Sequence, residues 1–306
     1  MAFKREGECS QTKRFKKVLG SSNGNPKGSM LAWTRRAIAS VAFFSGFNAI
    51  TNWWSRCANG PNLTVLAYHR VNNLPHDVDP FTVSPAQFAK QMAYLKRKHF
   101  HIITFSEALR LRSASLQRER VIILTFDDGY RDNFVNAVPI LNEFGFKACF
   151  FVRTDLIGRN AQEDNSSRRL NFPGMTEVDL RALFGKGFEI GAHTRNHSNL
   201  LELPLEAARR EVIESKLSLE KIVGAPVAYF AYPGGKRGIH YNETLKEMIS
   251  REFLVCCTTT RGRNSIRKLD FLEIHRICVQ RWWSPFYFAR ELEGTFDFVE
   301  NLTLRS

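Results

Sequence analysis

The six cysteines of this 306-residue chain form no CxxC pair and no zinc-finger spacing. Their positions are Cys9, Cys57, Cys149, Cys256, Cys257 and Cys278. The spacing excludes a cysteine-rich structural zinc site and a CxxC redox centre. Three of the cysteines, at 149, 256 and 257, lie in apolar, strand-like runs, where free cysteine packs as a small hydrophobic residue. We expect all six to be reduced packing residues.

The chain also lacks an apolar run long enough to cross a bilayer. The run AIASVAFFSGFNAI at 37–50 has about 14 residues, whereas a membrane-spanning helix needs about 20. Serine and asparagine interrupt it, and no convincing small-x-small cleavage site of a signal peptide follows. Tryptophan, phenylalanine and arginine around it favour an amphipathic helix at a membrane interface. Packing on the protein's own surface and an uncleaved anchor are the alternatives.

Acidic residues are scarce, since 30 Asp and Glu face 44 Lys and Arg, a formal charge of +14. Much of the excess lies in the first 36 residues, as suits a contact with nucleic acid or an anionic membrane, or a solvated leader. No basic-aromatic module follows, so we expect no nucleic-acid partner. The pattern predicts a disordered basic leader at 1–29, an amphipathic or apolar helical segment at 30–60 and one domain at 61–306.

Within that domain, short apolar strands alternate with helical patterns, and neither an internal repeat nor a second domain is evident. The predicted strands are 63–69, 101–105, 121–126, 147–152, 188–193, 227–232, 253–260 and 273–279, and the clearest predicted helices are 84–98, 131–145, 175–187 and 203–224. The alternation predicts an α/β fold with a parallel sheet, either open or closed as a (β/α) barrel. Eight strands favour the barrel. Active groups would then collect at the C-terminal strand ends.

One of these strand ends carries two adjacent carboxylates. The stretch TFDDGY at 125–130 closes the apolar run VIIL and brings Asp127 and Asp128 together. Two neighbouring carboxylates repel each other, and a buried charge without a partner is costly. We therefore expect either solvent or a cation at this position.

Another strand end carries two histidines four residues apart, His193 and His197, in FEIGAHTRNHSNL at 188–200. A helical turn there would project both imidazoles to one side. Two imidazoles and one carboxylate, Asp128, leave coordination positions open, as in catalytic zinc sites. Asp127 would then stay unligated beside a metal-activated water.

Together, TFDDGY and HTRNH resemble the NodB-homology polysaccharide deacetylases, carbohydrate esterase family 4. LAYHRVN at 66–72, FKACFFVRTDLIG at 146–158, FAYPGG at 230–235 and LEIHRICV at 272–279 extend the resemblance over most of the chain. The N-terminal segment is similar to leaders of exopolysaccharide-type members. The resemblance implies a deformed (β/α) barrel with a single catalytic domain and metal-assisted removal of N-acetyl groups from amino sugars.

The resemblance also implies residue roles. Asp127 would be the general base, and the metal ligands would be Asp128, His193 and His197. The backbone N–H of Gly234 would stabilise the oxyanion, in agreement with the chemistry of metal-assisted amide hydrolysis.

The sequence offers two candidates for the general acid, because the family's Leu-x-His motif is not cleanly present. His69 in LAYHR matches exopolysaccharide-type relatives and is favoured, while His275 in EIHRI is the alternative. The usual arginine and tyrosine of the third motif are missing from FAYPGG, so Arg276 is a candidate to orient the base. The two glycines of that motif could make its loop less rigid.

The predicted function is a metal-dependent hydrolase that removes N-acetyl groups from poly- or oligosaccharides containing N-acetylhexosamine. Alternatives are an O-acetyl or cell-wall glycan esterase or amidase on the same site, a degenerate glycan-binding protein, or a basic membrane scaffold. One divalent ion is expected, zinc first, with cobalt, nickel or manganese as alternatives. The expected partner is an acetylated glycan. The expected location is bacterial, either cytoplasmic or peripheral at the inner membrane, with an uncleaved N-terminal anchor as an option.

Overall fold

A computed structural model describes residues 62–74, 77, 79–110, 120–160 and 172–294. Apart from Gly294, all of these lie in one compact unit, Trp53–Glu293. The predicted leader at 1–29 and helical segment at 30–60 lie outside the described residues, so both stay predictions. In the ranges that are described, no helix is both long and apolar enough to cross a membrane.

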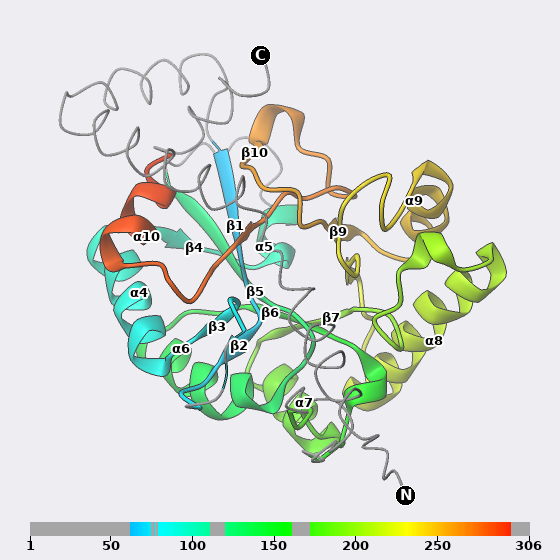
Figure 1. Ribbon diagram of the computed structural model, residues 1–306, viewed down its shortest axis with the longest axis horizontal. Helices are drawn as coiled ribbons and strands as arrows, with labels where there is room; N and C mark the ends of the chain where they lie inside the picture. Colours follow the sequence, from blue (N-terminus) through cyan, green and yellow to red (C-terminus); the bar gives the residue numbers. More distant parts are fainter. Residues whose placement is uncertain (1–61, 75–76, 78, 111–119, 161–171, 295–306) are drawn as a thin grey trace, which may run out of the picture. The chain divides into compact units, whose positions relative to one another are not determined.

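The centre of this unit is a nine-stranded sheet in the order β10-β1-β5-β6-β7-β8-β9, with β11 beside β1 and β4 beside β5 (Figure 1). The strands are β1 (Asn62–Tyr68), β2 (Arg70–Val71), β3 (Thr82–Val83), β4 (His101–Ile102), β5 (Val121–Phe126), β6 (Cys149–Val152), β7 (Glu189–Ala192), β8 (Tyr229–Ala231), β9 (Val255–Cys257), β10 (Asn264–Ser265) and β11 (Ile277–Cys278). All pairs in the sheet are parallel except β1 with β10. Each of the eight predicted strands is present, while β10 and the separate β2–β3 pair were not predicted.

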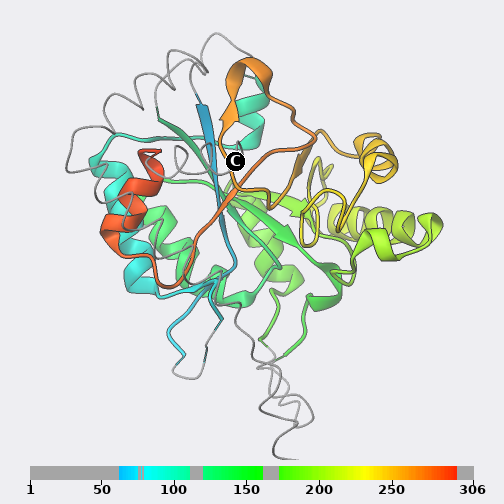
Figure 2. The ribbon, with the colours of Figure 1, turned by 45° about the horizontal axis from the view of Figure 1, so that its top comes forward.

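The sheet curls round until a late segment joins its two ends. Ile274 forms a parallel bridge with Cys257 of β9, and β11 then pairs in parallel with β1 through Leu66 and Ile277. Figure 2 shows the segment that carries β11 running beside β1. The fold is therefore the deformed barrel that the sequence predicts.

Two apolar cores follow from the alternation of side chains along the strands. Val121 and Ile123 of β5 pack inside the barrel with Val65 and Phe151. Their neighbours on β5, such as Leu124, pack in the larger cluster between the strands and the surrounding helices. Because both faces of the sheet are covered, the strands read as nearly continuous hydrophobic runs.

The cysteines in the described ranges are all free thiols. Cys149, Cys256 and Cys257 are buried in the strands, and Cys278 of β11 is partly buried. They pack as small hydrophobic residues, as the apolar runs around them predict. The other two cysteines, at 9 and 57, lie outside the described residues.

Most of the helices lie on the outer side of the strands (Figure 1), whereas α5 (Phe105–Arg110) packs Phe105 and Ala108 into the interior cluster. The other helices are α4 (Pro85–Arg97), α6 (Val138–Phe144), α7 (Glu177–Gly185), α8 (Leu205–Val223), α9 (Glu243–Ser250) and α10 (Pro285–Leu292), and a π-helical turn (Asn133–Ala137) precedes α6. Helix α4 begins as predicted, because the Ser84 hydroxyl accepts the Gln87 N–H at 3.2 Å. Gly145 ends α6 with a φ of +70°.

Replacing Gly191 in β7 with alanine tests how tightly side chains fill the barrel interior. A Cβ atom at this position would lie 2.4 Å from Cδ1 of Phe151, so Gly191→Ala should lower the free energy of unfolding by about 1–3 kcal/mol. Gly185→Ala in α7 is the control, because nothing lies within 4 Å of its Cβ position. Urea denaturation measures both. Equal stability of the two variants would contradict the close contact.

Candidate active site

The predicted site residues lie at the C-terminal ends of neighbouring parallel strands. Asp127 and Asp128 follow β5, His193 follows β7, and His69 follows β1. Gly234 lies in the loop after β8. Because the C-terminal ends of parallel strands meet at one edge of a barrel, these residues come together there.

Three of the predicted residues form a compact set of donor atoms. His193 Nε2 lies 3.6 Å from Asp128 Oδ1, and His197 Nε2 lies 3.5 Å from the same oxygen. One donor atom from each residue lies within 4.8 Å of the others. The structure thus brings together the three predicted metal ligands, although their role as ligands stays a prediction.

The donor set fits a divalent ion. Ligand atoms that lie about 2.1 Å from a tetrahedral zinc ion are about 3.4 Å from one another. The two distances from Asp128 match that spacing. Two imidazoles and one carboxylate also leave coordination positions for water and substrate, as catalytic sites require.

His193 is held ready to act as a ligand. Its Nδ1 lies 2.7 Å from the Ala231 carbonyl oxygen, an acceptor that places the proton on Nδ1 and leaves the Nε2 lone pair free. Burial, together with the neighbouring His197, lowers the pKa of His193 to about 4. The imidazole is therefore neutral at pH 7.

The loop that carries the two histidines is not the helical turn that the spacing suggested. Thr194 and His197 adopt left-handed backbone conformations, with φ of +60° and +58°. The Thr194 hydroxyl accepts the His197 N–H at 3.0 Å and stabilises this shape. Asp128 is left-handed too, with φ of +72°. Such strain at non-glycine residues is typical of functional sites.

Asp127 is paired with Arg276, the residue that the sequence offers in place of the missing motif arginine. Two guanidinium nitrogens of Arg276 donate to the two carboxylate oxygens of Asp127, each at 2.7 Å. Arg276 also donates through Nε to the Thr258 carbonyl at 2.8 Å. Both partners are almost fully buried. Arg276 therefore lies where it can orient the carboxylate, although Asp127 as the base stays a prediction.

The ion pair controls the charge of Asp127. Burial by itself raises the pKa of this carboxyl, but the Arg276 guanidinium, with His193 and His69, holds the pKa well below its usual range. Asp127 is therefore ionised at neutral pH.

The two candidate general acids, His69 and His275, lie in different surroundings. His69 Nε2 lies 4.0 Å from Asp127 Oδ2, and its ring stacks on Phe81 with centroids 4.9 Å apart. His275 lies instead against Gly262, where a Cβ atom would be 3.0 Å from its Nδ1. Of these two, His69 is the one beside Asp127, and its role as the acid stays a prediction.

The loop of Gly234 is held at several points, although the sequence suggested a less rigid loop. Thr259 donates from its hydroxyl to the Gly234 carbonyl at 2.5 Å and from its N–H to the Gly235 carbonyl at 3.0 Å. His240 Nδ1 accepts the Lys236 N–H at 3.1 Å. These hydrogen bonds supply a restraint that the two glycines cannot provide themselves.

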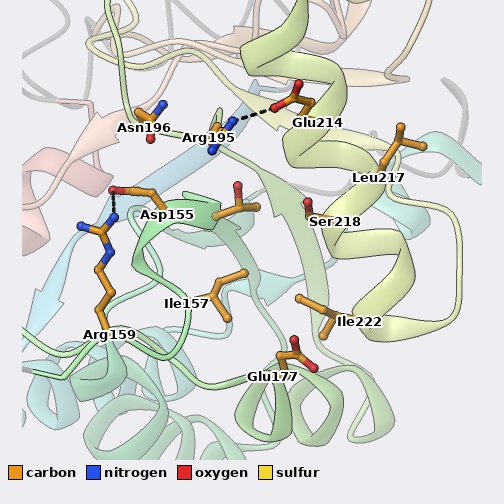
Figure 3. Close-up of a pocket in the computed structure, with 11 residues that line it drawn as sticks. Asp155, Ile157, Arg159, Glu177, Arg195, Asn196, Glu214, Leu217, Ser218 and Ile222 are labelled. Carbon is orange, nitrogen blue, oxygen red and sulfur yellow. Dashed lines mark hydrogen bonds and ion pairs between the residues drawn. The ribbon is translucent and has the colours of Figure 1, made fainter.

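A cleft of about 710 Å³ borders the metal-ligand loop on the side of α8 (Figure 3). Asn196 and Arg195, the residues before His197, lie at one end of it, and Arg195 pairs with Glu214 at 2.9 Å. Asp155, another residue of its wall, is bound by Arg153 through two hydrogen bonds of 2.7 and 2.8 Å. The sequence indicated none of these contacts, and those to α8 join segments that are far apart along the chain.

Comparison with known proteins identifies the family. A family model for polysaccharide deacetylase matches residues 115–252. Residues 115–252 belong to a polysaccharide deacetylase domain. It is 26% identical over 246 residues to YxkH of Bacillus subtilis, whose name assigns it to the polysaccharide deacetylases, and the match covers 80% of this chain and 81% of that protein.

Two further matches support the polysaccharide deacetylase assignment. The poly-beta-1,6-N-acetyl-D-glucosamine N-deacetylase of Staphylococcus aureus is 25% identical over 214 residues, 60% of this chain and 71% of that protein. The structure of the Streptococcus pyogenes deacetylase PplD in complex with acetate has a TM-score of 0.64 and 25% identity, and covers 76% of this chain and 98% of that one. The predicted family and enzyme class are confirmed.

Replacing Arg276 tests the buried ion pair. Arg276→Met leaves the Asp127 carboxylate buried without its partner, so the free energy of unfolding of the metal-free protein should fall by about 3–5 kcal/mol at pH 7. Arg181→Met, which breaks the exposed pair of Arg181 with Glu177 at 3.2 Å, is the control and should cost less than about 1 kcal/mol.

The fall in the free energy of unfolding caused by Arg276→Met should also depend on pH. Because the pKa of Asp127 is lower in the folded protein than in the unfolded chain, the pair stabilises the fold above the unfolded value of about 3.9. This contribution disappears as the pH falls through the folded pKa. In Arg276→Met the unpaired carboxyl binds a proton more readily, which relieves the cost of its burial. The difference between wild type and variant should therefore shrink in acid, and a difference that is constant from pH 7 to pH 4 would contradict the assignment.

Proposed function

We propose that this protein is a metal-dependent hydrolase that removes N-acetyl groups from polymers or oligomers of N-acetylhexosamine. The observation that carries the proposal is the set Asp128, His193 and His197 with the ionised Asp127 beside it. The staphylococcal relative, named for poly-beta-1,6-N-acetyl-D-glucosamine, supports β-1,6-linked N-acetylglucosamine as the first substrate to test.

The metal is proposed to be zinc. An ion held by the three residues would act as a Lewis acid and lower the pKa of a water molecule. Cobalt, nickel and manganese suit the same ligands, so metal analysis decides among them.

Asp127 and His69 carry out the two proton transfers of the reaction. Asp127, oriented by Arg276, accepts a proton from the attacking water, whose oxygen bonds to the acetyl carbon. The Gly234 N–H donates a hydrogen bond to the developing oxyanion. His69 donates a proton to the amide nitrogen as the C–N bond breaks. Acetate and the free amine of the sugar are the products.

An O-acetyl or cell-wall glycan substrate is the alternative for the same site, because an ester carbonyl presents the same oxygen to the ion. Acetate release from a panel of N- and O-acetylated glycans separates the two. The bacterial location, in the cytoplasm or peripheral at the inner membrane, is also a proposal, and the N-terminal segment on which it depends lies outside the described residues.

Substitutions at His193 and Asp127 separate metal binding from proton transfer. His193→Ala should lose both bound metal and acetate release, because it removes a ligand. Asp127→Asn should keep the metal yet lose about 100-fold or more in kcat, because the base is absent. Metal content and acetate release from β-1,6-linked N-acetylglucosamine oligomers are the measurements. A folded, fully active His193→Ala would refute the proposal.

The two candidates for the acid can be compared directly. His69→Gln should lower kcat by about 100-fold or more while metal content stays at the wild-type level. His275→Gln should leave kcat close to wild type, because the His275 ring lies against Gly262. The reverse ranking of the two variants would assign the acid to His275.

A further inference from the structure

One carboxylate of helix α8 fastens the loop that carries His197. The Asn196 N–H donates to Glu211 Oε2 at 2.8 Å, and Asn196 Nδ2 donates to Glu211 Oε1 at 2.6 Å. The backbone carbonyl of Glu211 also accepts the Arg195 N–H at 3.1 Å. Three acceptor atoms of one residue thus hold the two residues directly before a predicted metal ligand.

The two histidines differ in how the barrel supports them. His193 is buried at the end of β7 and bound to the Ala231 carbonyl. The His197 side chain is 38% exposed, and its N–H bonds within the loop, to Thr194. The left-handed conformations at Thr194 and His197 are unfavourable by themselves, so this loop needs a restraint from outside.

We propose that Glu211 is a positioning residue that holds His197 in place for the metal. The inference rests on the proposed function, because it concerns the same metal site. Glu211 acts through Asn196 and does not touch the ion. Residues that hydrogen-bond a metal ligand typically change metal affinity by about 10- to 100-fold when they are replaced, and Glu211, which acts one residue away from His197, should lie at the lower end of that range.

The carboxylate is suited to this task because it is an acceptor at both oxygens. Asn196 presents two donors, its N–H and its side-chain amide, and each finds an oxygen of Glu211. A glutamine at position 211 has the same size but one NH₂ donor in place of an acceptor. In either orientation, Glu211→Gln would therefore set that NH₂ against one of the Asn196 donors while it preserves packing.

Helix α8 also provides a matched control. Glu214 lies one turn further along and pairs with Arg195 of the same loop at 2.9 Å (Figure 3). Both side chains of that pair are exposed, and the bond reaches a side chain, not the loop backbone. Exposed pairs contribute little, so Glu214→Gln should leave metal affinity within about twofold of wild type.

The test is metal affinity of the full chain. Metal-free protein is titrated with Co²⁺ by visible absorption, and Zn²⁺ affinity is measured by competition with a chelator. Glu211→Gln should bind both ions about 10-fold more weakly than wild type. At saturating metal its kcat should return close to wild type, because the catalytic groups are intact.

Equal affinity of Glu211→Gln and wild type would overturn the inference. If Glu211→Gln does not fold, Asn196→Ala decides, since it removes one of the two donors and leaves α8 unchanged. A loss of affinity in Asn196→Ala beyond that of Glu214→Gln supports the inference, and no loss overturns it.

The proposed function can fail separately. A wild type that binds metal but releases no acetate refutes the deacetylase and leaves the affinity comparison intact. A wild type that releases acetate, with unchanged affinity in Glu211→Gln, overturns only the role of Glu211. A wild type that binds no divalent ion overturns both.

Discussion

The site depends on one buried ion pair, that of Arg276 with Asp127. A carboxylate this deep in the barrel would otherwise bind a proton or destabilise the fold. The guanidinium binds both of its oxygens and is itself bound to the Thr258 carbonyl. The carboxylate is therefore kept charged and fixed in orientation by a single residue.

That residue also belongs to the segment that closes the barrel. Ile274 bridges to β9, and β11 pairs with β1, with Arg276 between them. The segment that closes the sheet therefore also places the guanidinium beside Asp127. The arrangement explains how the chain can lack the third-motif arginine and still orient Asp127.

Two of the three predicted metal ligands, together with Thr194, depend on a second constraint, which is local backbone strain supported by neighbouring elements. Asp128, Thr194 and His197 all have left-handed backbone conformations. Hydrogen bonds to the Thr194 hydroxyl, the Ala231 carbonyl and the Glu211 carboxylate stabilise the histidine loop in this geometry. The barrel edge and one outer helix together define the shape of the site.

Eight of the eleven strands, the main helices, the barrel and the residues that meet at its edge could be predicted without coordinates. Hydrophobic runs are local signals, and TFDDGY and HTRNH are short motifs, so each can be read within a few positions of the chain. Four features required the folded chain. They are the bidentate pairing of Asp127, the non-helical histidine loop, the bonds of Thr259 to the Gly234 loop, and the contact of Glu211 with Asn196. Three of these join groups from separate segments of the chain, and the fourth is a strained loop held by such a contact. The packing of the closed barrel sets those distances, and no local pattern encodes them.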